Sequence, residues 1–272
     1  MKSNQCVPRQ EVALDRLIRG WGQSVTGQKP PYIFPGDKDA LLKTKSQPYS
    51  TCSNLSSFTK TNSFGKCDGQ LQLGLSPSPY VGDLRRATVF ILVANPGLHV
   101  ADFLVEEHRD LRQACHNTLR QKKLDGCFPF MHLNPKHARH PGFHYWFKKL
   151  LPVVSKVAEE RRSSFLDALK HTAKWVACLD LLGYHSCRSG VQRLLGDLPS
   201  VKAMQEFVQC DLLRRAERGR ATIIVTRCTT LWGLPPRPPQ HVVVYTGHQC
   251  QGASLAPESP GGKAMLERLC CG

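Results

Sequence analysis

Four short apolar runs recur along the C-terminal two-thirds of the chain. They are rich in Val, Ile and Leu and lie at Thr88–Ala94, Lys174–Leu182, Ala221–Arg227 and His241–Thr246. Each run is bounded by polar or turn residues, a pattern that is typical of a strand buried on both faces. We therefore predict four strands that share one sheet.

Segments with helical periodicity separate these runs. Between Ala101 and Arg120, side chains such as Leu104, Leu111 and Leu119 recur so that they form one apolar stripe. Further helices are expected at Phe143–Val154, at Ser163–Thr172, from an N-cap at Ser200 to Gly219, and at Gly262–Leu269. Because strands and helices alternate, the predicted fold class is α/β, a three-layer sandwich with a mainly parallel four-stranded sheet.

The N-terminal third lacks such patterns. Apart from a short helix expected at Glu11–Gly20, it holds little periodicity, and Ser, Thr, Asn, Gly and Pro make up more than half of residues 46–79. This composition favours a long covering loop or partial disorder over residues 28–79. We expect residues 1–80 to form an extension that is largely loop or partly disordered, and residues 81–272 to form a single α/β domain with a Pro/His-rich insert at 126–142.

The size of the net charge and the spread of basic residues along the chain indicate a class of partner. The chain holds 37 Lys and Arg against 21 Asp and Glu, a net charge of +16. Basic pairs such as Arg85-Arg86 and Lys148-Lys149 occur along the whole chain, which indicates positive patches on a folded surface. Such a surface favours an acidic partner, and DNA is the one we expect.

The sequence also predicts a compartment. No run approaches the roughly 20 apolar residues of a membrane helix, and the N-terminus lacks the apolar centre of a signal peptide. We therefore expect a cytoplasmic protein without membrane contact. The twelve cysteines are scattered and form no C-x-x-C pair, so they are expected to be reduced. The oligomeric state stays open.

A turn motif ends the first predicted strand. Proline followed by glycine in Asn95-Pro96-Gly97 is what a type II turn requires, so a plain reversal of the chain is one interpretation. The other interpretation is functional. A polar side chain at the carboxyl end of a strand, beside a helix N-terminus, can orient a water molecule or bind an anion.

The second and third predicted strands bring further polar residues to the same edge. Tyr184, His185 and Ser186 follow the second strand, where tyrosine can stack on a base and the other two can hydrogen-bond to its edge. A strand-to-helix turn with a satisfied tyrosine is the alternative. Asp180 lies inside the second strand and needs a partner. Arg227, which ends the third strand, is the expected partner, or else it contacts a phosphate.

Ala94-Asn95-Pro96-Gly97-Leu98 resembles the first motif of the mismatch-specific thymine/uracil branch of the uracil-DNA glycosylase superfamily, Gly-x-Asn-Pro-Gly-Leu. Val93 stands where that motif has its glycine. The chain as a whole is similar to a bacterial branch of α/β proteins that carry the Asn-Pro-Gly motif. The resemblance implies a four-stranded parallel α/β sheet, a flipped deoxynucleotide as substrate, and Asn95 as the residue that positions the water attacking C1′.

The second motif of that superfamily is His-Pro-Ser or Asn-Pro-Ser after the last strand. Here Gly247-His248-Gln249 follows the fourth run, so His248 has a suitable place but Pro-Ser does not follow it. On this resemblance the expected catalytic residues are Asn95, His248 and Asp180. The expected substrate-binding residues are Pro96, Gly97, Phe103, Tyr184, His185, Ser186 and Arg227, with Phe103 or Tyr184 stacking on the base.

Other chemistries are less well supported by the sequence. The spacing of four histidines could supply zinc ligands, but prolines break the segment and no carboxylate lies among them, so we expect a basic surface insert and no metal: His132, His137, His140 and His144. The chain holds no Gly-x-Ser-x-Gly elbow, Walker A loop or dinucleotide fingerprint, and no cofactor is expected.

The sequence thus predicts a glycosylase-like enzyme that hydrolyses the N-glycosidic bond of a flipped, damaged or mismatched base in DNA. Two alternatives remain. One is a non-catalytic nucleic-acid-binding module of the same fold, which the missing Pro-Ser favours. The other is an enzyme that acts on a small nucleotide-like substrate.

Overall fold

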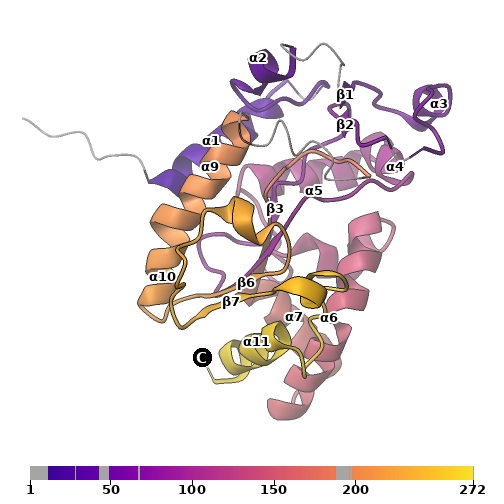
Figure 1. The fold of residues 1–272 in the computed structure, drawn as a ribbon. Coiled ribbons are helices and arrows are strands. Elements are labelled where there is room, and N and C mark those ends of the chain that lie inside the picture. Colours follow the sequence, from indigo (N-terminus) through magenta and orange to yellow (C-terminus); the bar gives the residue numbers. More distant parts are fainter. Residues whose placement is uncertain are drawn as a thin grey trace, which may run out of the picture.

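The computed structural model describes residues 12–27, 29–42, 49–66, 68–187, 196 and 198–271. Its main sheet has the strand order β3-β5-β4-β6-β7 (Figure 1). The strands are β3 (Tyr80–Val81), β4 (Val89–Val93), β5 (Val176–Asp180), β6 (Thr222–Val225) and β7 (Val242–Val244). The four strands predicted from the apolar runs are all present and mutually parallel, so the α/β class with a mainly parallel sheet is confirmed.

The sheet has a fifth strand that the sequence did not predict. The two-residue strand β3 pairs antiparallel with β5, with Tyr80 opposite Leu179. Pro79 cannot donate a backbone hydrogen bond, which is tolerated at the edge of a sheet. Gly82 follows at φ +108°, where a Cβ atom would lie 2.6 Å from the carbonyl oxygen of Val176. The chain can therefore pass close to β5 only because this residue is glycine.

Helices cover both faces of the sheet. The helical segments are α1 (Ala13–Ser24), α2 (Asp37–Leu42), α3 (Leu55–Phe58), α4 (Asp102–Glu107), α5 (Arg109–Leu119), α6 (Pro141–Glu160), α7 (Phe165–Trp175), α9 (Pro199–Glu206), α10 (Leu213–Glu217) and α11 (Pro260–Cys271), with short turns η1 (Met131–Leu133), η2 (Pro135–His137), η3 (Phe207–Leu212), η4 (Thr229–Trp232) and η5 (Gly247–Cys250).

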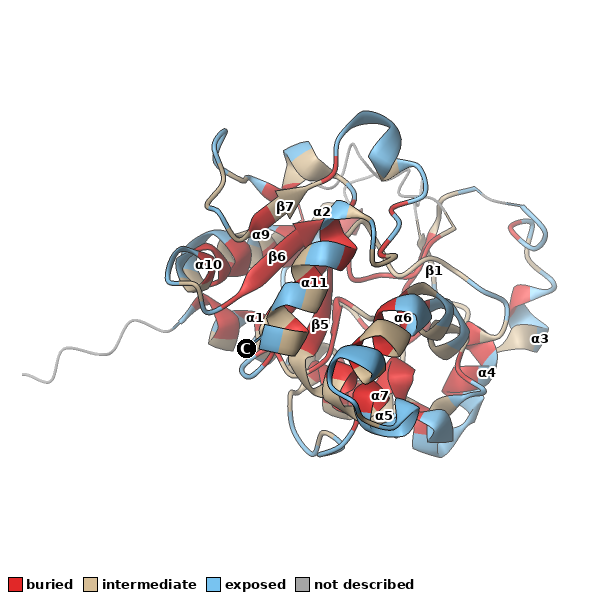
Figure 2. Ribbon diagram, turned by 90° about the horizontal axis from the view of Figure 1, so that it is seen from below, coloured by how far each residue is buried: buried red, intermediate tan, exposed pale blue. Residues whose placement is uncertain are grey.

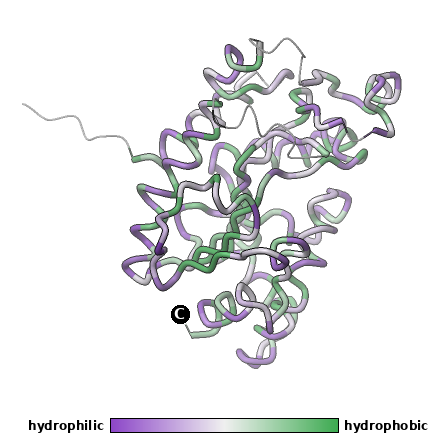
Figure 3. Tube along the Cα trace, viewed as in Figure 1, coloured by the Kyte–Doolittle hydropathy of each residue, from purple (hydrophilic) through white to green (hydrophobic). Residues whose placement is uncertain are grey.

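The alternation of side chains along β4 divides the core into two layers. Phe90 and Leu92 pack with residues of α1, α9 and η3, whereas Val89 and Ile91 pack with residues of α6, α7 and α11. Successive side chains of a strand point to opposite faces, so one apolar run serves both layers. Figure 2 shows β5 and β6 buried between the helices, and Figure 3 shows the apolar positions gathered in the strands.

Two helix boundaries differ from the sequence predictions. The single helix expected from Ala101 to Arg120 is two helices, α4 and α5, because His108 has extended backbone angles (φ −87°, ψ 105°). The N-cap expected at Ser200 is Leu198, and Pro199 occupies the first turn of α9. Proline fits there because the first helical residues have no intrahelical partner for their amide groups.

The described part of residues 28–79 is tied into the molecule by backbone hydrogen bonds. Strands β1 (Tyr49–Ser50) and β2 (Leu71–Gln72) form a small parallel sheet. The amide of Gln72 donates to the carbonyl of His185 (2.9 Å) and that of Tyr32 to the carbonyl of Leu73 (2.8 Å). This part is therefore more regular than a covering loop. The division into an extension and a domain at residue 80 stays a prediction.

The prediction that all cysteines are reduced is wrong. Nine cysteines in the described ranges are free thiols, but Cys187 is disulfide-bonded. In the same ranges, no helix is long and apolar enough to span a membrane.

Candidate functional site

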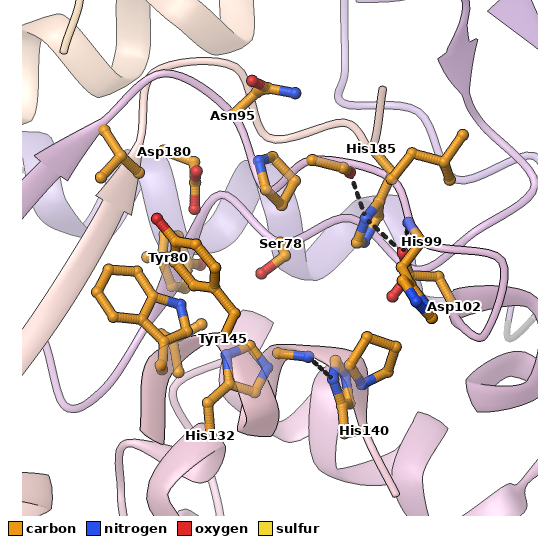
Figure 4. A pocket seen from close by; sticks show the side chains of 18 of the residues that line it. Ser78, Tyr80, Asn95, His99, Asp102, His132, His140, Tyr145, Asp180 and His185 are labelled. Atoms are coloured by element: carbon orange, nitrogen blue, oxygen red, sulfur yellow. Dashed lines mark hydrogen bonds and ion pairs between the residues drawn. The ribbon is translucent and has the colours of Figure 1, made fainter. Parts of the chain in front are cut away.

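A cavity of about 780 Å³ lies at the carboxyl ends of β4, β5 and β6. Val93 and Asp180 are register partners at the ends of β4 and β5, so the residues that follow both strands reach one edge. The cavity is closed on other sides by α4, η1 and α6. In Figure 4, Asp180 and Tyr145 lie on one side of the cavity, His185 and Asp102 on the opposite side, and His132 and His140 below.

Asn95 is held by the segment that follows β5. Its Nδ2 donates to the backbone oxygen of Ser186 (2.8 Å) and to the Ser186 Oγ (3.2 Å). Because the amide nitrogen is held by Ser186, the Oδ1 atom is the end of the side chain that can accept a hydrogen bond from a ligand. Pro96 and Gly97 also line the cavity. Gly97 has φ +74°, which agrees with the predicted type II turn.

His185 is held by two residues in the segment from the end of β4 to the start of α4. Its Nδ1 lies 3.0 Å from the carbonyl oxygen of Gly97 and 3.6 Å from the Asp102 Oδ2. A carbonyl oxygen only accepts hydrogen bonds, so Nδ1 carries the proton and Nε2 of the neutral ring keeps a free electron pair. The Asp102 Oδ2 is itself held by the backbone amide of His99 (2.7 Å). The arrangement resembles a base with an orienting carboxylate behind it.

Asp180 stands at the end of β5 without the partner that the sequence predicted. The residue is 4% exposed, and its Oδ1 has no hydrogen-bond partner among the described residues. No ion pair joins it to Arg227 among the described residues, although both line the cavity. Burial raises the pKa of Asp180 well above its usual range. The carboxyl group is therefore poorly suited to act as a base near neutral pH.

Two cations line the same side of the cavity. Arg227 is exposed, and the Lys149 Nζ donates to the carbonyl of Gly252 (2.9 Å). Burial and the neighbouring Arg227 lower the pKa of Lys149. In the part of the chain that the structure describes, neither side chain forms a salt bridge with a carboxylate. Two cations of this kind favour an anionic group of a ligand.

The prediction that the four histidines of the insert lie at the surface is wrong for two of them. His132 and His140 are buried and line the cavity, because the flanking Phe130 and Leu133 pack into the core and carry this segment inward. Burial lowers the pKa of His140 to about 3 and that of His132 well below its usual value. Both rings are therefore neutral. Across the described residues, no group of three or more His, Cys, Asp or Glu could hold a metal ion.

Four of the predicted site residues do not line the cavity: Phe103, Tyr184, His248 and Ser186, the last of which holds the lining residue Asn95. Phe103 is buried and stacks on Phe58, with ring centroids 4.4 Å apart. The Tyr184 hydroxyl donates to the Asp37 Oδ2 (2.7 Å) and accepts from the backbone amide of Phe34 (2.9 Å). His248 is exposed on η5. Phe103 and Tyr184 are thus core residues, which was the alternative interpretation for Tyr184.

Four polar residues that the sequence pattern did not single out also line the cavity. Tyr145 and Lys149 are one turn apart on α6, and Asp102 and Glu106 are one turn apart on α4. Polar pairs at this spacing share a helix face and were a usable signal. Tyr145 keeps 53% of its surface accessible, while burial at its hydroxyl end raises the pKa of the phenol. It offers the accessible aromatic ring that Phe103 and Tyr184 do not.

Comparisons of this chain with protein-family models, with curated proteins and with solved structures found no match.

Proposed function

We propose that the cavity receives a single base drawn out of DNA and that the protein hydrolyses the N-glycosidic bond of that base. The observation that carries the proposal is the pairing of Asn95 with His185. Both follow parallel strands, and each is fixed by the other's segment: Asn95 by Ser186, and His185 by Gly97. A residue that orients water and one that can accept a proton are thereby held at one edge of the cavity.

The proposed reaction needs no group besides these residues and water. The Asn95 Oδ1 accepts a hydrogen bond from the water, whose oxygen forms the new bond to C1′. The bond between C1′ and the base nitrogen breaks, and its electron pair leaves with the base. The water proton passes to the His185 Nε2, and Asp102 stabilises the resulting imidazolium. His248 takes no part in this scheme, because it does not line the cavity.

Binding of DNA is supported by charge. The net charge of +16 favours the phosphate backbone, and Arg227 and Lys149, which form no salt bridge among the described residues, favour a phosphate beside the cavity. The accessible ring of Tyr145 replaces Phe103 and Tyr184 as the stacking surface for a flipped base.

The test is the release of a base from duplex oligonucleotides. The duplexes carry uracil, thymine mismatches or deaminated purines, and alkali-labile abasic sites are measured. We expect Asn95→Ala to lower the rate at least about 100-fold, the usual effect of losing a fixed polar group at the reacting centre. Gln113→Ala, which removes an exposed amide on α5 away from the cavity, serves as the matched control and keeps the wild-type rate.

The absence of abasic sites on every duplex would overturn the proposal. Tight binding to duplex without base release would instead indicate the non-catalytic module of the same fold.

A small-nucleotide enzyme is the second candidate, and the size of the cavity favours it. A volume of about 780 Å³ falls within the roughly 300–1,000 Å³ that whole small-molecule ligands occupy. Binding to duplex distinguishes the two. A DNA enzyme that contacts several phosphates loses affinity steeply as salt rises. Release of a base from free nucleotides without measurable duplex binding would favour the second candidate.

A further inference from the structure

Asp180 is unusual among the acids that line the cavity. Asp102 accepts from the backbone amide of His99 (2.7 Å), and Glu106 accepts from the backbone amide of Ser76 (2.5 Å). Each of those carboxyl groups therefore has a donor within the protein. The Asp180 Oδ1 is buried and has no such donor in the part of the chain that the structure describes. An unsatisfied buried polar atom destabilises a fold, and at a cavity wall it indicates a group that a ligand completes.

The polar neighbours of Asp180 do not supply that missing partner. The Tyr80 hydroxyl on β3 donates to the carbonyl of Leu119 (2.5 Å), and the Thr226 hydroxyl after β6 donates to the carbonyl of Leu92 (3.0 Å). Lys149 on α6 donates to Gly252, and Arg227 forms no salt bridge with Asp180 among the described residues. Cys178, on the same strand, is a buried thiol.

Tyr145 offers an accessible aromatic ring at this end of the cavity. Its phenol interacts electrostatically with Asp180 and Arg227, and Figure 4 shows Tyr145 and Asp180 on the same side of the cavity. Since 53% of Tyr145 is accessible, a flat ligand can lie on the ring while its edge meets the carboxyl group.

Resting on the proposed function, we infer that Asp180 and Tyr145 form the subsite that recognises the base: the neutral Asp180 carboxyl pairs with an edge that presents a donor beside an acceptor, and Tyr145 stacks on the ring. A carboxylic acid has one O–H donor and one carbonyl acceptor side by side. It therefore fits the amide edge of a uracil-like base or the amino–imine edge of an adenine-like base.

The environment of Asp180 supports the neutral form. Burial raises the pKa of this carboxyl group, and the described structure pairs it with no cation. An ionised carboxylate would only accept hydrogen bonds and would repel the acceptor of the edge. Binding should therefore weaken as pH rises through the raised pKa of Asp180.

The test uses the full chain and four probes that carry a methyl group where the sugar would be. They are 1-methyluracil with its edge-blocked analogue 1,3-dimethyluracil, and 9-methyladenine with N6,N6,9-trimethyladenine. Calorimetry measures each dissociation constant. We expect at least one unblocked base to bind at about 0.1–1 mM, a range suited to so small a ligand. Its blocked analogue should bind at least about tenfold more weakly.

Variants assign the effect to Asp180. Asp180→Asn keeps a donor beside an acceptor, so it should bind within about threefold of wild type and lose the dependence on pH. Asp180→Ala and Tyr145→Ala should each bind at least about tenfold more weakly. Asp180→Ala removes an unsatisfied buried group, so its Tm should equal or exceed that of wild type. A loss of binding in that variant is then not a loss of folding.

Three results would overturn the inference: equal binding of blocked and unblocked bases, wild-type binding by Asp180→Ala, or no binding of any probe up to about 10 mM. The outcome is separable from that of the proposed function. If base binding depends on Asp180 but no abasic sites form in DNA, the subsite is supported and the glycosylase activity is contradicted. If Asp180→Ala releases bases from DNA at the wild-type rate, the glycosylase activity is supported and the subsite is contradicted.

Discussion

Polar residues at the carboxyl edge of the sheet differ strongly in how well their side chains are hydrogen-bonded. Asn95 and His185 each form hydrogen bonds with a neighbouring segment, whereas Asp180 is buried at the end of β5 and its Oδ1 has no partner within the described ranges. Stability alone does not favour an acid at this position, because its strand neighbours Cys178 and Leu179 are fully buried. Such a residue is better explained by a ligand than by folding.

The difference in stability between wild type and Asp180→Asn should depend on pH. The folded-state pKa of Asp180 is raised, so from about pH 4 up to that pKa the folded chain binds more protons than the unfolded one, and rising pH destabilises it. Asn does not titrate. Because Asp180 stays protonated at pH 7 in the folded chain, urea unfolding should show Asp180→Asn more stable than wild type by roughly 4 kcal/mol at that pH. The difference should vanish near pH 4, and a constant difference would contradict this account.

Helix α6 begins at a buried titratable residue. Its N-cap is His140, whose Nδ1 accepts from the backbone amide of Gly142 (3.0 Å). The same ring faces His132, with centroids 4.5 Å apart. Capping and burial together require a neutral imidazole, because an accepting nitrogen cannot carry a proton. The start of α6 is therefore sensitive to acid.

His140→Asn should remove part of that sensitivity. Burial lowers the pKa of His140 to about 3 from its usual 6.5, so between these values the unfolded chain binds more protons and falling pH destabilises the fold. Asn still caps the helix but does not titrate. Between pH 7 and pH 4, wild type should lose roughly 3 kcal/mol more than the variant in urea unfolding.

The matched control for that comparison is His144→Asn, at an exposed position of the same helix. It should follow the wild-type dependence on pH. If His140→Asn also follows it, the buried neutral histidine is not the cause of acid destabilisation.

At the scale of the whole molecule, residues far apart in sequence share one core. Leu17 and Trp21 of α1 and Leu73 after β2 belong to the same apolar cluster as Phe90 of β4. Helix α1 packs on α9 and η3, and these segments lie together in Figure 1. The described part of residues 12–80 thus supplies apolar side chains to one face of the sheet.

Removal of residues 1–80 should abolish cooperative unfolding. Each large apolar side chain contributes about 1.5–3 kcal/mol on burial, and the loss of Leu14, Leu17, Trp21, Leu71 and Leu73 alone approaches the total stability of about 5–15 kcal/mol of a typical protein. Thermal unfolding followed by near-ultraviolet circular dichroism checks this. A sharp transition in the shortened chain would instead show that residues 81–272 fold alone, as the sequence predicted.

The sequence by itself determined four of the strands and several of the polar residues at their carboxyl ends. Short apolar runs bounded by turn residues, such as Val89–Val93, predict strands buried on both faces. Parallel strands bring their carboxyl ends together, so the positions of Asn95, His185, Asp180 and Arg227 along the chain placed them at one edge. Strand β3 was missed because its two residues form no pattern and pair only through β5.

Tertiary structure decided which side chains on helices and inserts reach the cavity. Tyr145 and Lys149 on α6 face it, while Phe103 and Tyr184 pack into the core and His248 lies outside on η5. Periodicity identifies one face of a helix, but which neighbour covers that face depends on packing between segments distant in sequence. The buried, unpartnered state of Asp180 has the same origin, because its surroundings come from β3, β6 and α6 rather than from its own strand.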